Sequence, residues 1–182
     1  MLKQLLQTIS RKKIILEKPA GVSAIKGSFF DLSVKLINGD HFNFSELENK
    51  KTLIVNTASK CGFTPQFKVL EEIHNKYKNK LTIIGFPCND FLFQDPSSNK
   101  KIKEFCSVNY GVSFLMSEKV TLKSTSCSPV FKWLTDPKMN GWNSQLPTWN
   151  FCKYLIDENG ELLLFANSLI QPDDDCILKF IN

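Results

Sequence analysis

Short apolar runs separated by turn residues begin near residue 28 and continue to the end of the chain. Residues 28–34 and 37–44 flank Asn38-Gly39, a dipeptide typical of the tight turn in a β-hairpin. Further strands are predicted at residues 52–56, 81–86, 151–156 and 161–165. The last two are joined by a polar turn, so they predict a closing hairpin.

Two longer segments repeat their apolar residues with the period of a helix. Thr64-Pro65 is a helix start signal, and the helix that it opens is predicted to end near Asn79. A second helix is predicted at residues 98–109, with Cys106 facing inward. Short helices are predicted at residues 128–135 and after Pro172. The order of strand, helix, strand, helix and hairpin predicts an α/β fold with a central mixed sheet flanked by helices.

The first 25 residues differ in composition from the rest. They contain five basic residues and one acid, and their apolar residues Leu2, Leu5, Leu6 and Ile9 share one helical face. This pattern fits both an amphipathic targeting peptide and a solvated terminal extension. We therefore divide the chain into residues 1–25, a basic extension or targeting peptide, and residues 26–182, a single folded domain.

Charge and length exclude several classes of protein. The chain has 182 residues and a net charge of +5, with 23 Lys and Arg spread along it rather than gathered in one block. That distribution does not favour nucleic-acid binding. The longest apolar runs are a few residues long, whereas a bilayer span needs about 18 to 20, so no transmembrane segment is expected.

Six cysteines and two histidines limit the available chemistry. The nearest two cysteines, Cys88 and Cys106, stand 18 residues apart, which excludes a C-x-x-C pair and a zinc knuckle. The other four are Cys61, Cys127, Cys152 and Cys176. Free thiols in a reducing compartment are expected, because the chain has enough apolar residues to form a core without disulfides. His41 and His74 are interpreted as structural or solvated, which leaves no histidine base for a cysteine nucleophile.

Cys61 is the thiol best placed for chemistry. It follows the predicted strand 52–56 and precedes the helix that begins near Pro65, and α/β folds bind ligands at such carboxyl ends of strands. A thiol before a helix N-terminus faces unpaired backbone N–H groups and the positive end of the helix dipole, which favour the thiolate. Neighbouring Lys60 acts in the same direction. An inert core cysteine is the alternative interpretation.

Four segments together resemble the glutathione peroxidase family. In chain order they are NTASKCGFTPQ (56–66), GFPCNDFLFQDP (85–96), EFCSVNYGVSF (104–114) and WNF (149–151). The likeness runs from about residue 28 to the end of the chain. It implies a thioredoxin fold with an added N-terminal β-hairpin. It also implies reduction of hydrogen peroxide and of organic or lipid hydroperoxides in the response to oxidative stress.

The resemblance assigns the reaction to four residues. Cys61 occupies the position of the peroxidatic residue, and the remaining catalytic positions are matched by Gln94, Trp149 and Asn150. A thiolate that attacks a peroxide expels an alkoxide or hydroxide, so the site must stabilise an anion and protonate the leaving group. Two amides and an indole N–H are neutral donors suited to that task, and they make a histidine base unnecessary. Taken singly, the three residues also fit a turn glutamine, a core tryptophan and a capping asparagine.

Regeneration depends on a second thiol. Attack leaves a sulfenic acid at Cys61, which must be reduced before it oxidises further. Cys106 matches the resolving cysteine of family members that form an internal disulfide and are reduced by thioredoxin, and a thiol packed in the core is the alternative. Closure of the disulfide is expected to require local unwinding of the second helix. The implied reductant is a thioredoxin-like protein, with glutathione as the other candidate, and no bound cofactor or metal is expected.

A short connection bears on substrate access. Only 15 residues separate Trp133 from Trp149, and the family's tetrameric, glutathione-specific members carry a longer insertion there. The resemblance therefore implies a monomer with an open site that admits bulky lipid hydroperoxides, including those of membranes. The expected location is the cytoplasm, or the mitochondrion if residues 1–25 act as a targeting peptide. A thiol redox sensor or relay that passes its disulfide to a partner protein is the alternative function.

The segment around Gln94 departs from the family's pattern. Asp90 stands in place of a glutamine, and Leu92-Phe93 stand in place of two glycines. Glycines permit backbone angles that other residues avoid, so the loop that carries Gln94 is expected to be reshaped. A carboxylate at position 90 would disfavour the Cys61 thiolate if it pointed inward.

Overall fold

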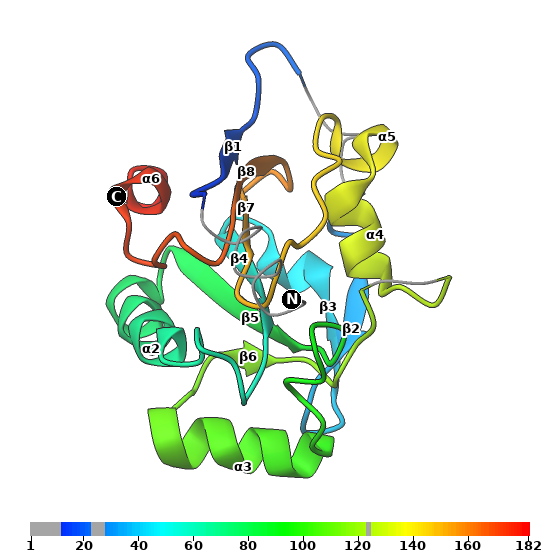
Figure 1. The fold of residues 1–182 in the computed structure, drawn as a ribbon. Coiled ribbons are helices and arrows are strands. Elements are labelled where there is room, and N and C mark those ends of the chain that lie inside the picture. The colour runs from blue at the N-terminus through cyan, green and yellow to red at the C-terminus, as the bar shows by residue number, and fades with distance from the viewer. Residues whose placement is uncertain (1–11, 23–27, 123–124) are drawn as a thin grey trace.

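One mixed sheet forms the centre of the molecule, and helices cover it (Figure 1). The computed structural model describes residues 12–22, 28–122 and 125–182. The sheet has six strands in the spatial order β1, β8, β7, β4, β5 and β6. Along the chain they are β1 (Ile15–Glu17), β4 (Lys51–Thr57), β5 (Leu81–Pro87), β6 (Leu115–Met116), β7 (Lys153–Ile156) and β8 (Leu162–Ala166).

Parallel and antiparallel pairing meet at β4. This strand runs parallel to β5 and antiparallel to β7, and β5 runs parallel to β6. Strands β7, β8 and β1 continue the antiparallel half of the sheet. After Lys51, every residue of β4 is buried, because both faces of this strand are covered. The predicted α/β fold with a central mixed sheet is confirmed.

The helices divide between the two faces of the sheet. They are α2 (Gln66–Tyr77), α3 (Asn99–Tyr110), α4 (Pro129–Thr135), α5 (Pro137–Asn140) and α6 (Asp175–Leu178). Leu53 and Val55 of β4 pack in the same core cluster as the inward residues of α2, α3 and α6. Ile54 between them packs in a second cluster with residues of α4, as the two-residue period of a strand requires. None of the helices in the described parts of the chain is long and apolar enough to cross a membrane.

A hairpin precedes the main sheet, as predicted. Strands β2 (Ser33–Lys35) and β3 (His41–Asn43) pair antiparallel in a sheet of their own. Gly39 in the turn between them has a φ of +98°, which explains the glycine after Asn38. The chain then enters the 3-10 helix η1 (Phe44–Leu47), whose buried Phe44 and Leu47 anchor the hairpin to the α4 side of the core.

The N-terminal segment differs from the expected division of the chain at residue 26. Strand β1 pairs with β8, with Ile15 opposite Ala166 and Glu17 opposite Leu164, so this part of the segment belongs to the sheet. Asn167 extends the contact by donating to the backbone oxygen of Lys12 (2.8 Å). An apolar stretch next to an open strand edge explains the pairing, since the edge offers unpaired backbone groups. Residues 1–11 lie outside the described residues, so a targeting role stays a prediction.

Candidate active site

Cys61 lies in the turn between β4 and α2, at the carboxyl end of the central strand. Thr64 shapes this turn, because its Oγ1 accepts from the Cys61 backbone N–H (3.0 Å) and donates to the oxygen of Ala58 (2.9 Å). The backbone N–H of Phe63 points at Cys61 Sγ over 3.4 Å. The sulfur is buried, so this N–H acts on it with little competition from water. A thiolate at Cys61 would therefore meet an N–H donor already in place.

Gln94 is held beside the Cys61 turn by its backbone and by Asn150. Its backbone oxygen accepts from the N–H of Lys60 (2.9 Å), and its Oε1 accepts from Asn150 Nδ2 (2.9 Å). Asn150 is fully buried, and its own oxygens accept from Ser168 Oγ (2.5 Å) and Cys88 Sγ (3.6 Å). The structure thus brings Gln94 and Asn150 into direct contact and places Gln94 next to the residue before Cys61.

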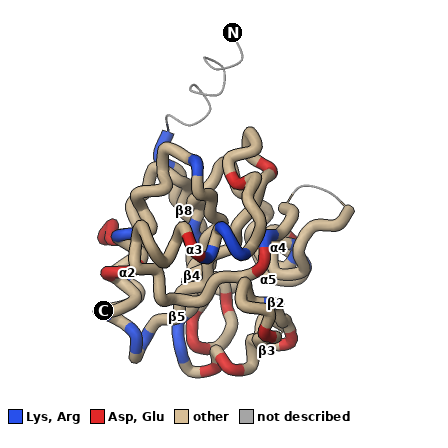
Figure 2. The backbone as a smooth tube through the Cα atoms, turned by 90° about the horizontal axis from the view of Figure 1, so that it is seen from below, with Lys and Arg blue, Asp and Glu red and all other residues tan. Residues whose placement is uncertain are grey.

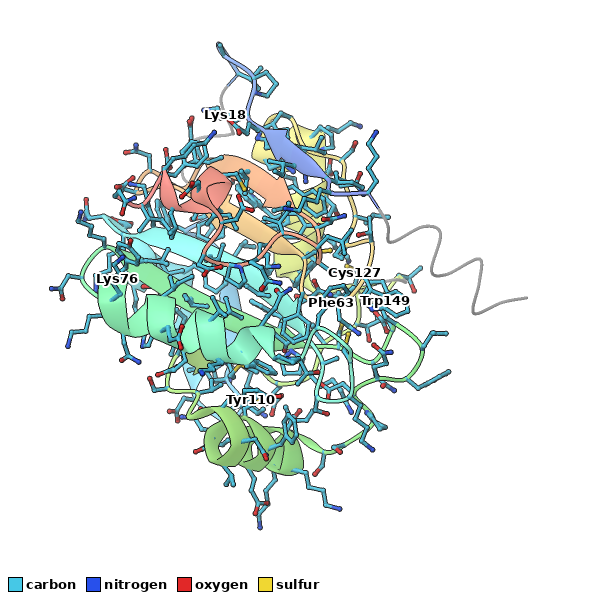
Figure 3. The ribbon with its side chains drawn as sticks, turned by 60° about the vertical axis from the view of Figure 1, so that its left-hand side comes forward. Lys18, Phe63, Lys76, Tyr110, Cys127 and Trp149 are labelled. Carbon is cyan, nitrogen blue, oxygen red and sulfur yellow. The ribbon has the colours of Figure 1, made fainter. Side chains whose placement is uncertain are left out.

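Trp149 lies half-buried at the same end of the sheet as the Cys61 turn. Figure 3 labels Trp149 and Phe63 next to each other, and both pack against the core cluster that contains Cys61. The indole ring stacks at a tilt on Phe91, with 5.6 Å between ring centroids. In the described residues, no hydrogen bond links Cys61 Sγ to the side chains of Gln94, Trp149 or Asn150. The four predicted residues therefore lie in one region. The hydrogen bond to the Cys61 sulfur comes from the backbone N–H of Phe63 in its own turn.

Asn56 is a structural partner of the site to which the sequence reasoning gave no role. It is fully buried at the end of β4, and its Nδ2 donates to the oxygen of Trp149 (2.9 Å). Its Oδ1 accepts from the backbone N–H of Cys152 (2.9 Å), so one side chain holds both ends of the Trp149–Cys152 segment. Phe151 between them has a φ of +65°, and its N–H donates to the backbone oxygen of Asn56 (2.5 Å). The available signal was an amide that directly follows the apolar residues Leu53, Ile54 and Val55 in a predicted buried strand.

Asp95 connects the Gln94 loop to the Cys61 turn. Its Oδ1 accepts from the backbone N–H of Ser59 (3.2 Å) and from Ser59 Oγ (2.6 Å). Burial raises the pKa of Asp95, and its hydrogen bonds to Ser59 act in the opposite direction. This contact and the backbone hydrogen bond from Lys60 to Gln94 together hold the Gln94 loop against the Cys61 turn.

The two residues that replace glycines adopt glycine-like backbone angles. Leu92 has a φ of +52° and Phe93 a φ of +54°. Left-handed backbone costs a residue with a side chain about 1 to 2 kcal/mol. Asp90, two residues earlier, accepts from the backbone N–H of Leu122 through its Oδ2 (2.5 Å), so this contact turns its carboxylate toward residue 122.

Cys106 faces the core from α3, as predicted. It belongs to the same core cluster as Cys61 and is 2% exposed. Burial raises the pKa of the Cys106 thiol to about 12. All six cysteines are free thiols. Among the described residues, no group of histidine, cysteine, aspartate and glutamate side chains is arranged to hold a metal ion.

Known proteins resemble this chain in sequence over most of its length. Residues 29–135 match the family model described as glutathione peroxidase. Glutathione peroxidase-like peroxiredoxin 2 of Saccharomyces cerevisiae is 44% identical over 146 residues, which cover 80% of this chain and 90% of that protein. A glutathione peroxidase of Lactococcus lactis is 42% identical, over 81% of this chain and 94% of the relative.

Solved structures agree with the fold. The crystal structure of Trgpx in its apo form has a TM-score of 0.64 and 31% sequence identity, and the match covers 87% of this chain and 97% of that chain. A thioredoxin-like protein from Aeropyrum pernix has a TM-score of 0.58 at 14% identity, over 83% of this chain and 89% of the other. At that identity the second likeness concerns the fold alone, and it confirms the expected thioredoxin-like arrangement.

Proposed function

The chain belongs to the glutathione peroxidase family and is a thiol peroxidase that acts in oxidative stress, and on that premise we propose that Cys61 is its peroxidatic thiol. Gln94, Trp149 and Asn150 complete the proposed site as neutral donors. The observation that carries the proposal is the Phe63 N–H directed at Cys61 Sγ (3.4 Å) in a turn that is bonded to the Gln94 loop. The substrates are hydrogen peroxide and organic or lipid hydroperoxides.

The first step transfers one oxygen atom to sulfur. The Cys61 thiolate attacks the terminal oxygen of the hydroperoxide, an S–O bond forms, and the O–O bond breaks. Sulfur loses two electrons and becomes a sulfenic acid, while the leaving alkoxide takes up a proton and departs as an alcohol, or as water from hydrogen peroxide. Donors that are already oriented lower the barrier, because charge develops on the sulfur and the leaving oxygen in the transition state.

The contact between Gln94 and Asn150 supports a donor role for the glutamine. Since Gln94 Oε1 accepts from Asn150 Nδ2, its own Nε2 is left to donate elsewhere. Asn150 is itself oriented by Cys88 and is fully buried, so the pair is fixed before substrate arrives. A fixed donor avoids the reorganisation that water would need.

Cys106 is the proposed resolving thiol. Its sulfur attacks the sulfur of the Cys61 sulfenic acid, an S–S bond forms and the S–O bond breaks, and the hydroxyl group takes up the proton of the Cys106 thiol and leaves as water. The raised pKa of buried Cys106, about 12, keeps this thiol protonated in the closed helix. Because Cys106 is also buried on α3, the proposed reaction includes a local opening of this helix that exposes the thiol. A thioredoxin-like protein then returns two electrons to the disulfide, with glutathione as the other candidate reductant. The monomeric state and a cytoplasmic or mitochondrial location stay predictions.

The test is peroxide-dependent NADPH consumption, measured with thioredoxin and its reductase and, separately, with glutathione and its reductase. Cys61→Ser is expected to reduce turnover to background with either reductant. Cys106→Ser is expected to abolish turnover with thioredoxin but to keep one stoichiometric turnover of peroxide. Gln94→Ala is expected to lower kcat/KM about 100-fold, the usual loss for one oriented donor. Cys176→Ser, a change to a half-buried thiol on α6, is the matched control and should keep wild-type turnover.

Two results would overturn the proposal. Full activity of Cys61→Ser would remove Cys61 from the reaction, and normal turnover of Cys106→Ser with thioredoxin would remove Cys106. Negligible turnover by the wild type, together with a peroxide-induced mixed disulfide to a partner protein, would instead identify a redox sensor or relay.

A further inference from the structure

Leu92 and Phe93 form an exposed apolar tip beside the proposed active site. They are 53% and 78% exposed, and both have left-handed backbone. Strained residues persist where the surroundings hold them, and they gather at functional sites. In the described part of the chain, Leu92 and Phe93 are not buried, so packing of their side chains does not offset the backbone strain. A contact outside this chain would explain why large apolar residues occupy this position.

The tip is held firmly at its base. On one side, Phe91 is buried and stacks on Trp149, and Asp90 accepts from the backbone N–H of Leu122. On the other side, Gln94 donates from its backbone to Phe91 (3.3 Å), and the next residue is bonded to Ser59. The loop therefore presents Leu92 and Phe93 in one orientation, immediately before the proposed donor Gln94.

The segment that follows the tip along the chain carries a net positive charge on its exposed residues. From residue 92 to residue 104 three lysines, Lys100, Lys101 and Lys103, and one acid, Glu104, are exposed, whereas Asp95 is buried. These lysines belong to the first half of α3, whose basic residues Figure 2 marks in blue. Lys60, in the Cys61 turn, is exposed as well. Apolar side chains at a loop tip that is followed by a lysine-rich helix start complement an anionic lipid bilayer, which takes up the apolar side chains and attracts the lysines.

We propose that Leu92 and Phe93 insert into the surface of an anionic lipid bilayer and thereby hold the Cys61 site against that surface. This inference rests on the proposed function, because the lipid hydroperoxides that such a site reduces lie in the bilayer itself. The tip shortens the path that an oxidised acyl chain must travel to the sulfur. A small peroxide reaches the same sulfur from water and does not need the tip.

The test compares the full-length wild type with the double variant Leu92→Gly/Phe93→Gly. Glycine accepts the left-handed backbone at both positions, so the variant removes the apolar side chains and relieves strain without disturbing the fold. Val108→Ser is the matched control, because Val108 is also 78% exposed but lies in α3, where serine and valine have similar helix propensity. Flotation with vesicles of phosphatidylcholine, with and without phosphatidylserine, measures binding. Turnover is measured with hydrogen peroxide and with a phospholipid hydroperoxide embedded in the same vesicles.

We expect the wild type to float with the phosphatidylserine vesicles, and less so at high salt. The double variant should bind at least tenfold more weakly and reduce the embedded hydroperoxide at least tenfold more slowly, with unchanged kcat/KM for hydrogen peroxide. Val108→Ser should behave as the wild type in each assay. Lys100→Gln/Lys101→Gln should lose binding to the anionic vesicles only.

Three outcomes would overturn the inference. The double variant could bind vesicles as the wild type does, or its turnover could fall equally with both peroxides. It could also keep vesicle binding and show a raised KM for thioredoxin, which would identify the tip as a protein docking site. Absence of hydrogen peroxide turnover in the wild type would instead contradict the proposed function, and the flotation result would still decide the role of the tip.

Discussion

Helices α2 and α3 have the same length and pack on the same face of the sheet, but they are held very differently. Each has 12 residues. Helix α2 buries Gln66, Phe67, Leu70, Ile73 and Tyr77, whereas α3 buries Ile102 and Cys106. Burial of apolar area is the dominant stabilising contribution to such packing. We infer that α3 opens from the sheet far more easily than α2.

The first turns of the two helices differ in the number of their basic residues. In α2, Gln66 donates from Nε2 to the oxygen of Ser168 (2.8 Å) and thereby ties the start of the helix to the core. Asn99 at the start of α3 accepts through Oδ1 from the backbone N–H of Lys119 (2.9 Å). Neither helix has a side-chain cap hydrogen bond at its N-terminus or an acid in its first turn, but α3 carries two lysines there, Lys100 and Lys101, and α2 carries one, Lys68. Positive side chains at that end are unfavourable with the helix dipole.

This difference matches the two roles proposed for the cysteines. Cys61 precedes the firmly held helix, where a nucleophile and its donors need constant geometry. Cys106 belongs to the weakly held helix, where a buried thiol must be released once in each cycle. The proposed roles make opposite demands, constant geometry at Cys61 and release of Cys106, and the two cysteines belong to different helix environments that fit these demands.

The largest expected effect comes from truncating the same residue type on each helix. Phe67→Ala on α2 should lower the free energy of unfolding by about 3 to 5 kcal/mol, because Phe67 is 1% exposed and packs on Tyr110 and Phe151. Phe105→Ala on α3 removes a half-buried ring and should cost less than half as much. Urea denaturation measures both. Equal losses would mean that α3 is held as firmly as α2.

Hydrogen exchange tests the comparison without a mutation. Amides of α3 should open at a free energy at least about 1.4 kcal/mol below those of α2, which is a tenfold difference in exchange rate. The buried amides of β4 serve as the reference for global unfolding. Matching protection in the two helices would contradict the proposed release of Cys106.

Alkaline pH tests whether α3 keeps Cys106 buried. The pKa of this thiol is about 12 in the folded chain against an ordinary 9.0, so between these values the unfolded chain loses a proton that the folded chain retains. Stability is then complete below pH 9 and falls as pH rises, by up to about 1.4 kcal/mol per pH unit for this group. In reducing buffer, Cys106→Ala should show a shallower loss than the wild type above pH 9. Parallel curves would show that Cys106 is not buried in solution.

The smallest expected effect comes from the first turn of α3. Lys100→Glu places a negative charge there and should stabilise the helix by about 0.3 to 1 kcal/mol. Opening of α3 in hydrogen exchange, and formation of the disulfide after a peroxide pulse, should slow together. Lys103→Glu makes the same change of charge beyond the first turn and is the control. A slower opening with unchanged disulfide formation would separate the helix from the resolving step.

Elements with a strong local signal were predictable. Asn38-Gly39 indicated the hairpin, and the helix expected from Thr64-Pro65 to about Asn79 is observed at Gln66–Tyr77. Short elements without such a signal were not predicted, among them β1, β6 and α5. Strand β1 has three residues and exists because β8 offers an open edge, which no local pattern reveals.

The sequence by itself determined the α/β fold, the place of Cys61 before a helix and the motifs of the family, because each depends on neighbouring residues or on their order. Only the tertiary structure decided that Asn150 holds Gln94, two residues 56 positions apart, and that Asn56 holds the segment of Trp149. It also decided that Leu92 and Phe93 keep a left-handed backbone and that α3 buries fewer of its residues than α2. These features depend on contacts between residues that are far apart in the sequence, and only the packing of the whole chain brings such residues together.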